Sequence, residues 1–184
     1  MINKCTNAAF YGNLDLLKKY HEEKGLPLDD NTCYVAVKNG NLECLKYCYE
    51  NGCSLNQIIL DVAIINGHFE CMKYIIENKY PVDQESIILA TEYGQLKCLI
   101  YLHHNGYGEL SETLLEIAIT NDHFSIVKYL IKHYCPFNEY NFYRLSLKYN
   151  TYKSFKFINN ILNNEVNKQI NNEIYDEKLP FILY

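Results

Sequence analysis

Positive charge is scarce in this chain of 184 residues. Its 17 lysine and arginine residues face 22 aspartate and glutamate residues, which leaves a formal net charge of -5, and Arg144 is the only arginine. The lysines are scattered, whereas a nucleic-acid partner needs a basic stripe that neutralises phosphates. We therefore expect no nucleic-acid partner.

Long apolar segments are also lacking. No run of about 18 apolar residues is present, which is the length a membrane-spanning helix needs. The opening residues, MINKCTNAAFYGN, do not contain the apolar core of a signal peptide. We therefore expect no membrane partner and an intracellular, cytoplasmic location.

Motifs for metal binding and catalysis are absent. Eight cysteines are present, but none forms a CxxC pair or the paired Cys/His spacing of a zinc site. Cys44, Cys71 and Cys98 lie 27 residues apart, a period that predicts small buried side chains packing against their copies. A Ser/His/Asp set, a phosphate-binding glycine loop and an HExxH string are also missing. We expect no cofactor, no metal and no enzymatic activity.

What the chain does contain is a repeated Ala-x-x-x-Gly pattern. Successive alanine positions are 28, 27, 27, 28 and 28 residues apart. A period of this size indicates a solenoid, whose units are stable only when they stack on their neighbours. The pattern lies at Ala8/Gly12, Ala36/Gly40, Ala63/Gly67 and Ala90/Gly94, with weaker copies at Ala118/Asp122 and Ser146/Asn150.

Each repeat also carries signals for two helices. Seven residues before the alanine lies a residue that favours the N-cap position, where its side chain accepts a hydrogen bond from the first helical turn. The glycine of the pattern ends this first helix. The first-helix caps are Asp29, Asn56, Asp83 and Ser111.

A second helix should begin directly after the glycine. Its expected N-caps are Asn13, Asn41, His68, Gln95 and His123. It should end at Gly25, Gly52 or Gly106 in a left-handed conformation, with Lys79 and Tyr134 replacing that glycine in two repeats. His103 and His104 are neighbours in the chain, so they should point to different sides of their helix.

The period alone would also admit a leucine-rich repeat, but each unit lacks the alternating strand segment of that repeat. Tetratricopeptide units are longer, at about 34 residues. The predicted fold is therefore an all-α helical solenoid of about six helix-loop-helix repeats.

Segments such as AVKNGNLECLKYCYENG and AIINGHFECMKYIIENK resemble the ankyrin repeat, whose second half reads roughly AAxxGHLEIVKLLLxxG. The resemblance covers residues 5 to 135 and continues weakly to Phe155. Its TPLH tetrapeptide is replaced by TCYV, ILDV, SIIL and LLEI, and each unit is shorter than the usual ~33 residues. We therefore expect β-hairpin fingers that are shortened or missing, a repeat stack over residues 1–150, and a C-terminal capping helix and tail over residues 151–184.

The ankyrin resemblance implies a monomeric, non-enzymatic module that holds a protein partner on the concave face formed by its first helices. Tyrosine and arginine are favoured anchors at interfaces, so Tyr11, Tyr34, Tyr93 and Arg144 are the strongest candidates. An ordinary solvated rim, rich in tyrosine because the genome is rich in A and T, is the alternative. The expected partner-binding residues are Tyr11, Tyr34, Lys38, Asn39, Asp61, Ile65, Asn66, Ile88, Glu92, Tyr93, Glu116, Thr120, Asn121 and Arg144.

The asparagine, isoleucine and tyrosine content resembles that of short ankyrin repeats abundant in giant DNA viruses of amoebae. A protist with an AT-rich genome is the other candidate source. The final LPFILY is similar to the opening of the F-box-like segment of some viral ankyrin proteins, although the chain ends too soon for a complete segment. The resemblance thus leaves open an adaptor that delivers a host protein to ubiquitin-ligase machinery in the host cytoplasm. A drifting copy of an expanded gene family, without a dedicated partner, is a third possibility.

Overall fold

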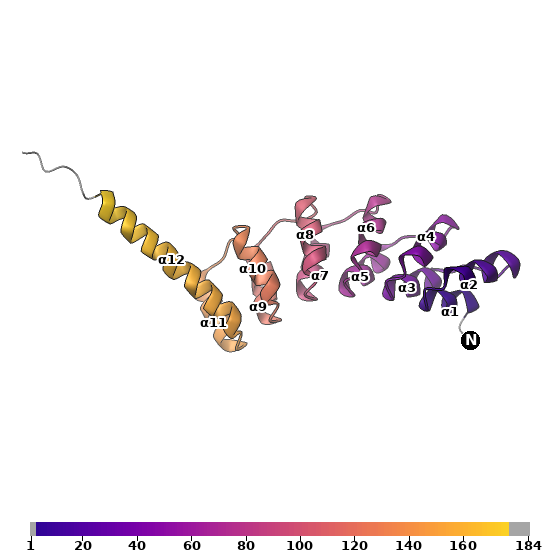
Figure 1. The fold of residues 1–184 in the computed structure, drawn as a ribbon, viewed down its shortest axis with the longest axis horizontal. Coiled ribbons are helices and arrows are strands. Elements are labelled where there is room, and N and C mark those ends of the chain that lie inside the picture. The colour runs from indigo at the N-terminus through magenta and orange to yellow at the C-terminus, as the bar shows by residue number, and fades with distance from the viewer. Residues whose placement is uncertain (1–2, 177–184) are drawn as a thin grey trace, which may run out of the picture. The chain divides into compact units, whose positions relative to one another are not determined.

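The computed structural model describes residues 3–176, with side chains described as far as residue 164. Over residues 3–176 the chain forms twelve α-helices and one π-helix and no β-strand, which confirms the predicted all-α fold (Figure 1). The LPFILY segment lies outside the described residues. The helices are α1 (Lys4–Phe10), α2 (Leu14–Lys18), η1 (Lys19–Glu23), α3 (Asp30–Lys38), α4 (Leu42–Glu50), α5 (Gln57–Ile65), α6 (Phe69–Glu77), α7 (Gln84–Glu92), α8 (Leu96–His104), α9 (Glu112–Thr120), α10 (Phe124–Lys132), α11 (Glu139–Lys148) and α12 (Tyr152–Asp176).

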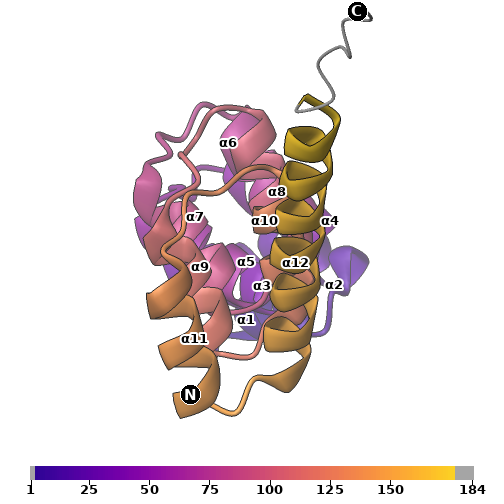
Figure 2. The same ribbon diagram turned by 90° about the vertical axis from the view of Figure 1, so that its left-hand side faces the viewer.

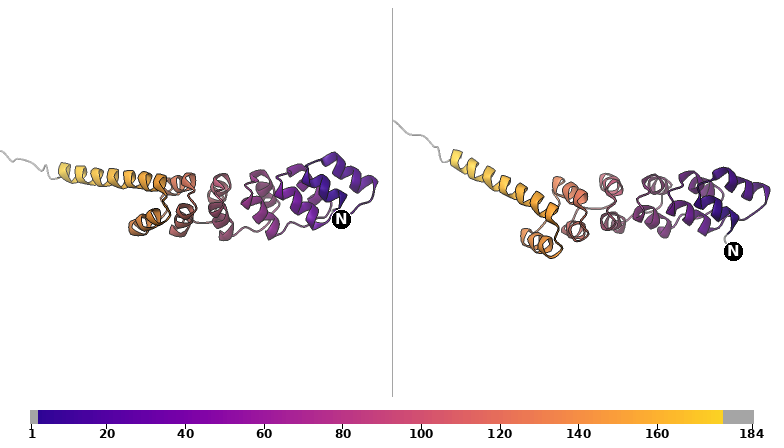
Figure 3. Two further views of the ribbon diagram at one scale, coloured as in Figure 1. Left: turned by 90° about the horizontal axis from the view of Figure 1, so that it is seen from below. Right: turned by 60° about the horizontal axis from the view of Figure 1, so that its bottom comes forward.

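The chain divides into two compact units, Met1–Leu110 and Ser111–Tyr184. In the first unit, α1 is paired with α2 and η1, α3 with α4, α5 with α6 and α7 with α8, and the helices of a pair lie side by side (Figure 3). The second unit contains the pairs α9/α10 and α11/α12. The division into a stack over residues 1–150 and a tail over residues 151–184 stays a prediction.

The first helices begin where their caps predict. Asp29 Oδ1 accepts a hydrogen bond from the backbone N–H of Thr32 at 2.8 Å, and Asn56 Oδ1 accepts one from Ile59 at 3.0 Å. Ser111 departs from this pattern, because α9 begins after it without a side-chain capping bond. Its carbonyl oxygen instead accepts a hydrogen bond from the Cys135 thiol at 3.1 Å.

The second helices begin directly after the predicted residues, since Asn13, Asn41, His68, Gln95 and His123 are their N-cap residues, but only Asn13 makes the expected side-chain capping bond. Asn13 caps α2, with a bond of 2.9 Å from the Leu16 N–H. The side chains of Asn41, His68, Gln95 and His123 do not cap the helices that follow them.

Three of these side chains reach back to the preceding repeat instead. Asn41 Nδ2 donates to the carbonyl oxygen of Ala9 at 2.8 Å, and Gln95 Nε2 donates to that of Ile65 at 3.0 Å. His68 Nε2 lies 3.0 Å from the Lys38 carbonyl oxygen. Each bond satisfies a carbonyl near the end of a first helix, where no intrahelical donor remains. These three hydrogen bonds therefore join neighbouring repeats.

The π-helix η1 accommodates an extra residue in the first repeat. Gly12 and Gly25 are 13 residues apart, whereas Gly40 and Gly52 are 12 apart. A π-type turn absorbs a single insertion within a helix. The hydrogen bond that closes the end of the helix changes accordingly. The Leu26 N–H donates to the carbonyl oxygen of Tyr20, six residues earlier, at 3.1 Å, whereas the Cys53 N–H donates to that of Cys48, five residues earlier.

The core is built from the repeated small and branched side chains. Cys44, Cys71 and Cys98 are buried in α4, α6 and α8, as the 27-residue spacing predicts, and all eight cysteines are free thiols. Burial raises the pKa of the Cys71 and Cys98 thiols to about 11, which keeps both neutral near neutral pH.

In the second unit, α12 packs along both α10 and α11, and Figure 2 shows α11 and α12 side by side. Ile158 of α12 is fully buried, and Tyr143 of α11 donates a hydrogen bond through its hydroxyl to Asn159 Oδ1 at 3.1 Å. The helix expected at the beginning of the tail is therefore present as α12.

Candidate functional site

The first helices of unit 1 carry exposed and half-buried side chains on their outward sides, which we call the first-helix face. It consists of the outward side chains of α1, α3, α5 and α7. Tyr11, at the end of α1, is 74% exposed, and Tyr93, at the end of α7, is 46% exposed. Single exposed side chains of this kind are ordinary on protein surfaces, whereas several that lie together mark a binding surface.

A groove lies on this face between α3 and α5. It has a volume of about 330 Å³ and is open to solvent. Tyr34 forms one wall, and Ile58, which is 62% exposed, lies on the other. The groove is lined by Asp30, Asn31, Tyr34, Asn56, Ile58 and Ile59.

Sequence reasoning found Tyr34 but missed Ile58. The alignment on the repeat alanine placed contacts two positions before it and next to the glycine, whereas Ile58 lies in the first turn of α5. A signal was available, since the residues at the same position are the polar Asn31, Glu85 and Thr113. An isoleucine among polar equivalents marks an apolar position on a solvated edge.

Asp30 is the one charged residue among those that line the groove. Asp30 is exposed in the first turn of α3, and Asp61 accepts a hydrogen bond from Gln57 Nε2 at 2.6 Å. The nearest basic group on α3 is Lys38, whose ammonium lies 5.9 Å from the centre of the Tyr34 ring. A positively charged group would therefore be attracted to the groove.

Two asparagines of unit 1 that were expected to contact a partner carry out a structural task. Asn39 Nδ2 donates to the Val35 carbonyl oxygen and Asn66 Nδ2 to that of Val62, each at 2.8 Å. Each bond satisfies one of the last carbonyls of its helix. A role for their remaining amide oxygens in binding stays a prediction.

The remaining expected residues of unit 1 lie on α5 and α7. Ile65 and Ile88 are half-buried, while Glu92 is exposed beside Tyr93. That they form one binding surface with Tyr11 and Tyr34 stays a prediction.

The other four expected residues belong to unit 2. Glu116 and Thr120 are half-buried on α9, and Arg144 is exposed on α11. The Asn121 Nδ2 donates to the Ile117 carbonyl oxygen at 2.9 Å, which repeats the arrangement of Asn39 and Asn66.

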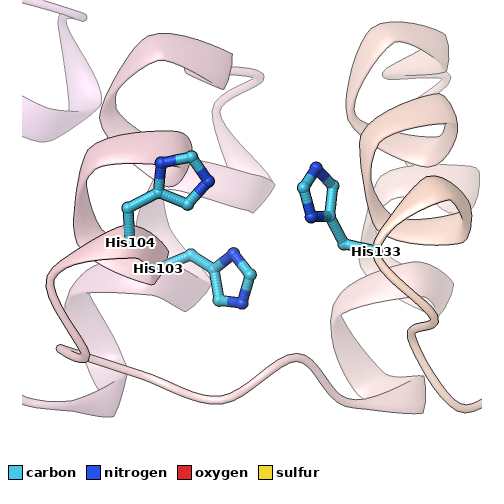
Figure 4. Close-up of side chains that lie close together, drawn as sticks. All are labelled: His103, His104 and His133. Atoms are coloured by element: carbon cyan, nitrogen blue, oxygen red, sulfur yellow. The ribbon is translucent and has the colours of Figure 1, made fainter.

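The neighbouring histidines differ from expectation. His103 and His104 leave the last turn of α8 with ring centroids 5.7 Å apart, rather than pointing to opposite sides (Figure 4). His104 is the last residue of α8. His133, also labelled in Figure 4, is the C-cap residue of α10 in the second unit.

Comparison with known proteins identifies similar sequences and structures. A family model described as "Ankyrin repeats (3 copies)" matches residues 6–86 and 63–141. Among solved structures, the human ASB11 ankyrin repeat domain is similar, with a TM-score of 0.62 and 22% identity, over 71% of this chain and 69% of that one. A search of curated proteins finds no match. Over the described residues, none of the helices has the length and apolar character needed to span a membrane.

Proposed function

Because the chain belongs to the ankyrin repeat family, whose members are generally protein-binding modules, we propose that it is a non-enzymatic, monomeric scaffold that binds a protein partner on its first-helix face. The observation that supports this most directly is the groove between α3 and α5. It combines an exposed isoleucine, a tyrosine wall and an exposed carboxylate in one concave surface.

The lining of the groove suits a lysine or arginine side chain of the partner. Tyr34 and Ile58 would cover its aliphatic stem, and Asp30 would receive its charged end. Tyr11 and Tyr93 would contact the partner on either side of the groove. Arg144 is a separate candidate contact on unit 2.

The test compares two double variants with the intact protein as baits in lysate of the source cell or its host. Tyr34→Ala/Ile58→Ala removes the two apolar walls, while Lys73→Ala/Glu77→Ala removes an exposed ion pair of 3.7 Å on the second-helix side. Truncating a central anchor costs about 2 kcal/mol or more, so affinity for the captured protein should fall by about 30-fold in the first variant. The second variant should bind as the intact protein does.

A captured protein that binds both variants equally would place the interface elsewhere. If none is captured specifically, the reading of a drifting gene copy gains support. Circular dichroism of both variants checks that their helicity is unchanged. Raising the salt concentration should weaken a partner held through Asp30, because exposed charges are screened.

The origin in a giant virus and the adaptor role rest on sequence resemblance alone. In that version, the partner is a host protein and the tail delivers it to ubiquitin-ligase machinery. Deleting residues 171–184 separates the two roles. A simple scaffold leaves the abundance of the captured partner unchanged, whereas an adaptor without its tail no longer depletes it.

A further inference from the structure

The end of α4 brings two cysteines together. Cys48 lies in the last turn of the helix, and Cys53 follows the turn at Gly52, whose φ is +96°. The Cys53 N–H donates to the Cys48 carbonyl oxygen at 3.1 Å. This closing bond places the two side chains against each other, in positions where helix ends usually make an apolar contact.

The same geometry recurs in other repeats with different chemistry. The Tyr107 N–H donates to Leu102 at 2.9 Å after α8, and the Cys135 N–H donates to Leu130 at 3.0 Å after α10. Neither of these turns has sulfur at both positions. The repeat therefore supplies the geometry, and the sequence of this one repeat supplies two thiols.

The two thiols interact and are sheltered. Cys48 is fully buried, and Cys53 is 7% exposed. The interaction between the two thiols lowers the pKa of Cys53 and raises that of Cys48. Cys53 in turn donates to the Asp29 carbonyl oxygen at 3.6 Å. Cys53 is also the less buried of the two thiols, so a small oxidant from solvent reaches it first.

We propose that Cys48 and Cys53 are a redox site, at which a peroxide oxidises the two thiols to a disulfide across the end of α4. The Cys53 thiolate attacks one peroxide oxygen, which gives a sulfenic acid and releases water after proton transfer. The Cys48 sulfur then attacks the Cys53 sulfur, the S–S bond forms, and the hydroxyl leaves as a second water. Two thiols are oxidised, and one hydrogen peroxide is reduced to two waters.

Oxidation also removes one link between neighbouring repeats. The Cys53 sulfur of the disulfide carries no hydrogen, so it cannot donate to the Asp29 carbonyl. Asp29 is the N-cap of α3 and directly precedes Asp30 of the groove. The hydrogen-bond acceptor of Cys53 is therefore the residue before Asp30 of the proposed binding surface, although the redox site does not depend on that function.

The test treats the folded full-length protein with hydrogen peroxide, blocks the remaining thiols by alkylation and digests the protein. Cleavage after Glu50 cuts the chain between Cys48 and Cys53, so their fragments stay joined only if the disulfide has formed. We expect joined fragments, loss of alkylation at both residues, and reversal by a dithiol reductant. Cys135 is the internal control, because it occupies the position of Cys53 but faces Leu130, and it should remain alkylated.

A Cys48→Leu variant reproduces the residue found at this position in α8 and α10, which favours normal folding. Its Cys53 should stop at the sulfenic acid, detected with a dione reagent, with no joined fragments. The proposal is overturned if Cys48 and Cys53 stay alkylated to the same extent as Cys135. It is also overturned if Cys53 joins another cysteine, or if joining occurs only when circular dichroism shows lost helicity.

Discussion

The two units are built from the same helix pair but differ at their turns and in their charge. In the first unit, glycine occupies each turn between paired helices, whereas Asp122 and Asn150 take that place in the second, with φ of 56° and 54°. The first unit has nine basic and fourteen acidic residues, and the second has eight of each. Every repeat therefore has a left-handed residue at this turn. In the second unit a residue other than glycine adopts that conformation, which costs backbone strain.

The second unit also contains more buried hydroxyl groups without a hydrogen-bond partner among the described side chains. Among the described side chains, the buried hydroxyls without a hydrogen-bond partner are Ser86 in the first unit and Ser146, Thr151 and Ser154 in the second. Each unpaired buried hydroxyl costs free energy, since its hydration is lost without a replacement. We infer that the second unit has the smaller stability margin.

The largest effect should come from a matched pair of core truncations, Leu102→Ala in the first unit and Leu130→Ala in the second. Both leucines are fully buried at the same position of their repeats. Each change should cost about 2–5 kcal/mol. Hydrogen exchange should show faster opening of α9–α12 with Leu130→Ala than of α7 and α8 with Leu102→Ala. Equal opening would remove the inferred difference in margin.

At alkaline pH the first unit should become the less stable of the two. Burial raises the pKa of Cys33 to about 12 and of Cys71, Cys98 and Cys135 to about 11, against an ordinary value of 9.0. The unfolded chain ionises first, so stability is intact below pH 9 and declines as the pH rises toward 11. Ionisation of each thiol in the unfolded chain lowers the free energy of unfolding by about 1.4 kcal/mol per pH unit over this range.

Three of these four thiols lie in the first unit, so its helices should lose more protection from hydrogen exchange between pH 8 and pH 10. Exchange rates must first be corrected for their intrinsic dependence on pH. A Cys71→Ala variant removes one titrating thiol and should show a shallower decline. An equal decline in both units would contradict this account.

A smaller change should make the second unit more like the first. Ser146 stands where the other repeats have alanine, and its buried hydroxyl has no partner. Ser146→Ala should therefore stabilise the second unit by about 1 kcal/mol, measured by urea unfolding. The reverse change, Ala118→Ser, should destabilise it by a similar amount. No gain from Ser146→Ala would mean that the hydroxyl is satisfied in solution.

The smallest effect concerns the helix caps. Asp29→Ala removes a capping bond of 2.8 Å and should cost about 1 kcal/mol, whereas Ser111→Ala removes no capping bond and should cost little. Thermal unfolding of the two variants measures this difference. Equal losses would show that Ser111 caps α9 in solution.

Much of the fold follows from local sequence signals. The starts of α3, α5 and α7 and the turns at Gly40, Gly52 and Lys79 were predictable because a cap or a left-handed residue acts within its own turn. The buried cysteines at 27-residue intervals were predictable for a related reason, since equivalent positions in stacked repeats meet the same neighbours.

The candidate site was only partly predictable. Tyr34 could be placed on the first-helix face by its phase relative to the alanine, but the groove also needs Ile58 from the next repeat. Its volume depends on how α3 and α5 pack, and one helix by itself carries no information on that spacing. The pairing of Cys48 with Cys53 was equally invisible as a spacing, because their contact arises from the turn at Gly52.

The sequence by itself therefore determined the repeat length, the helix boundaries and the membership of an all-α repeat fold, because these depend on signals within about one turn or one period. Only the tertiary structure decided where Asn41, His68 and Gln95 direct their side chains. Their acceptors are carbonyls about 30 residues earlier in the chain, and these come within reach only after neighbouring repeats stack. A side chain able to cap its own helix can satisfy a neighbouring repeat instead, and that choice depends on which carbonyls packing leaves without a donor.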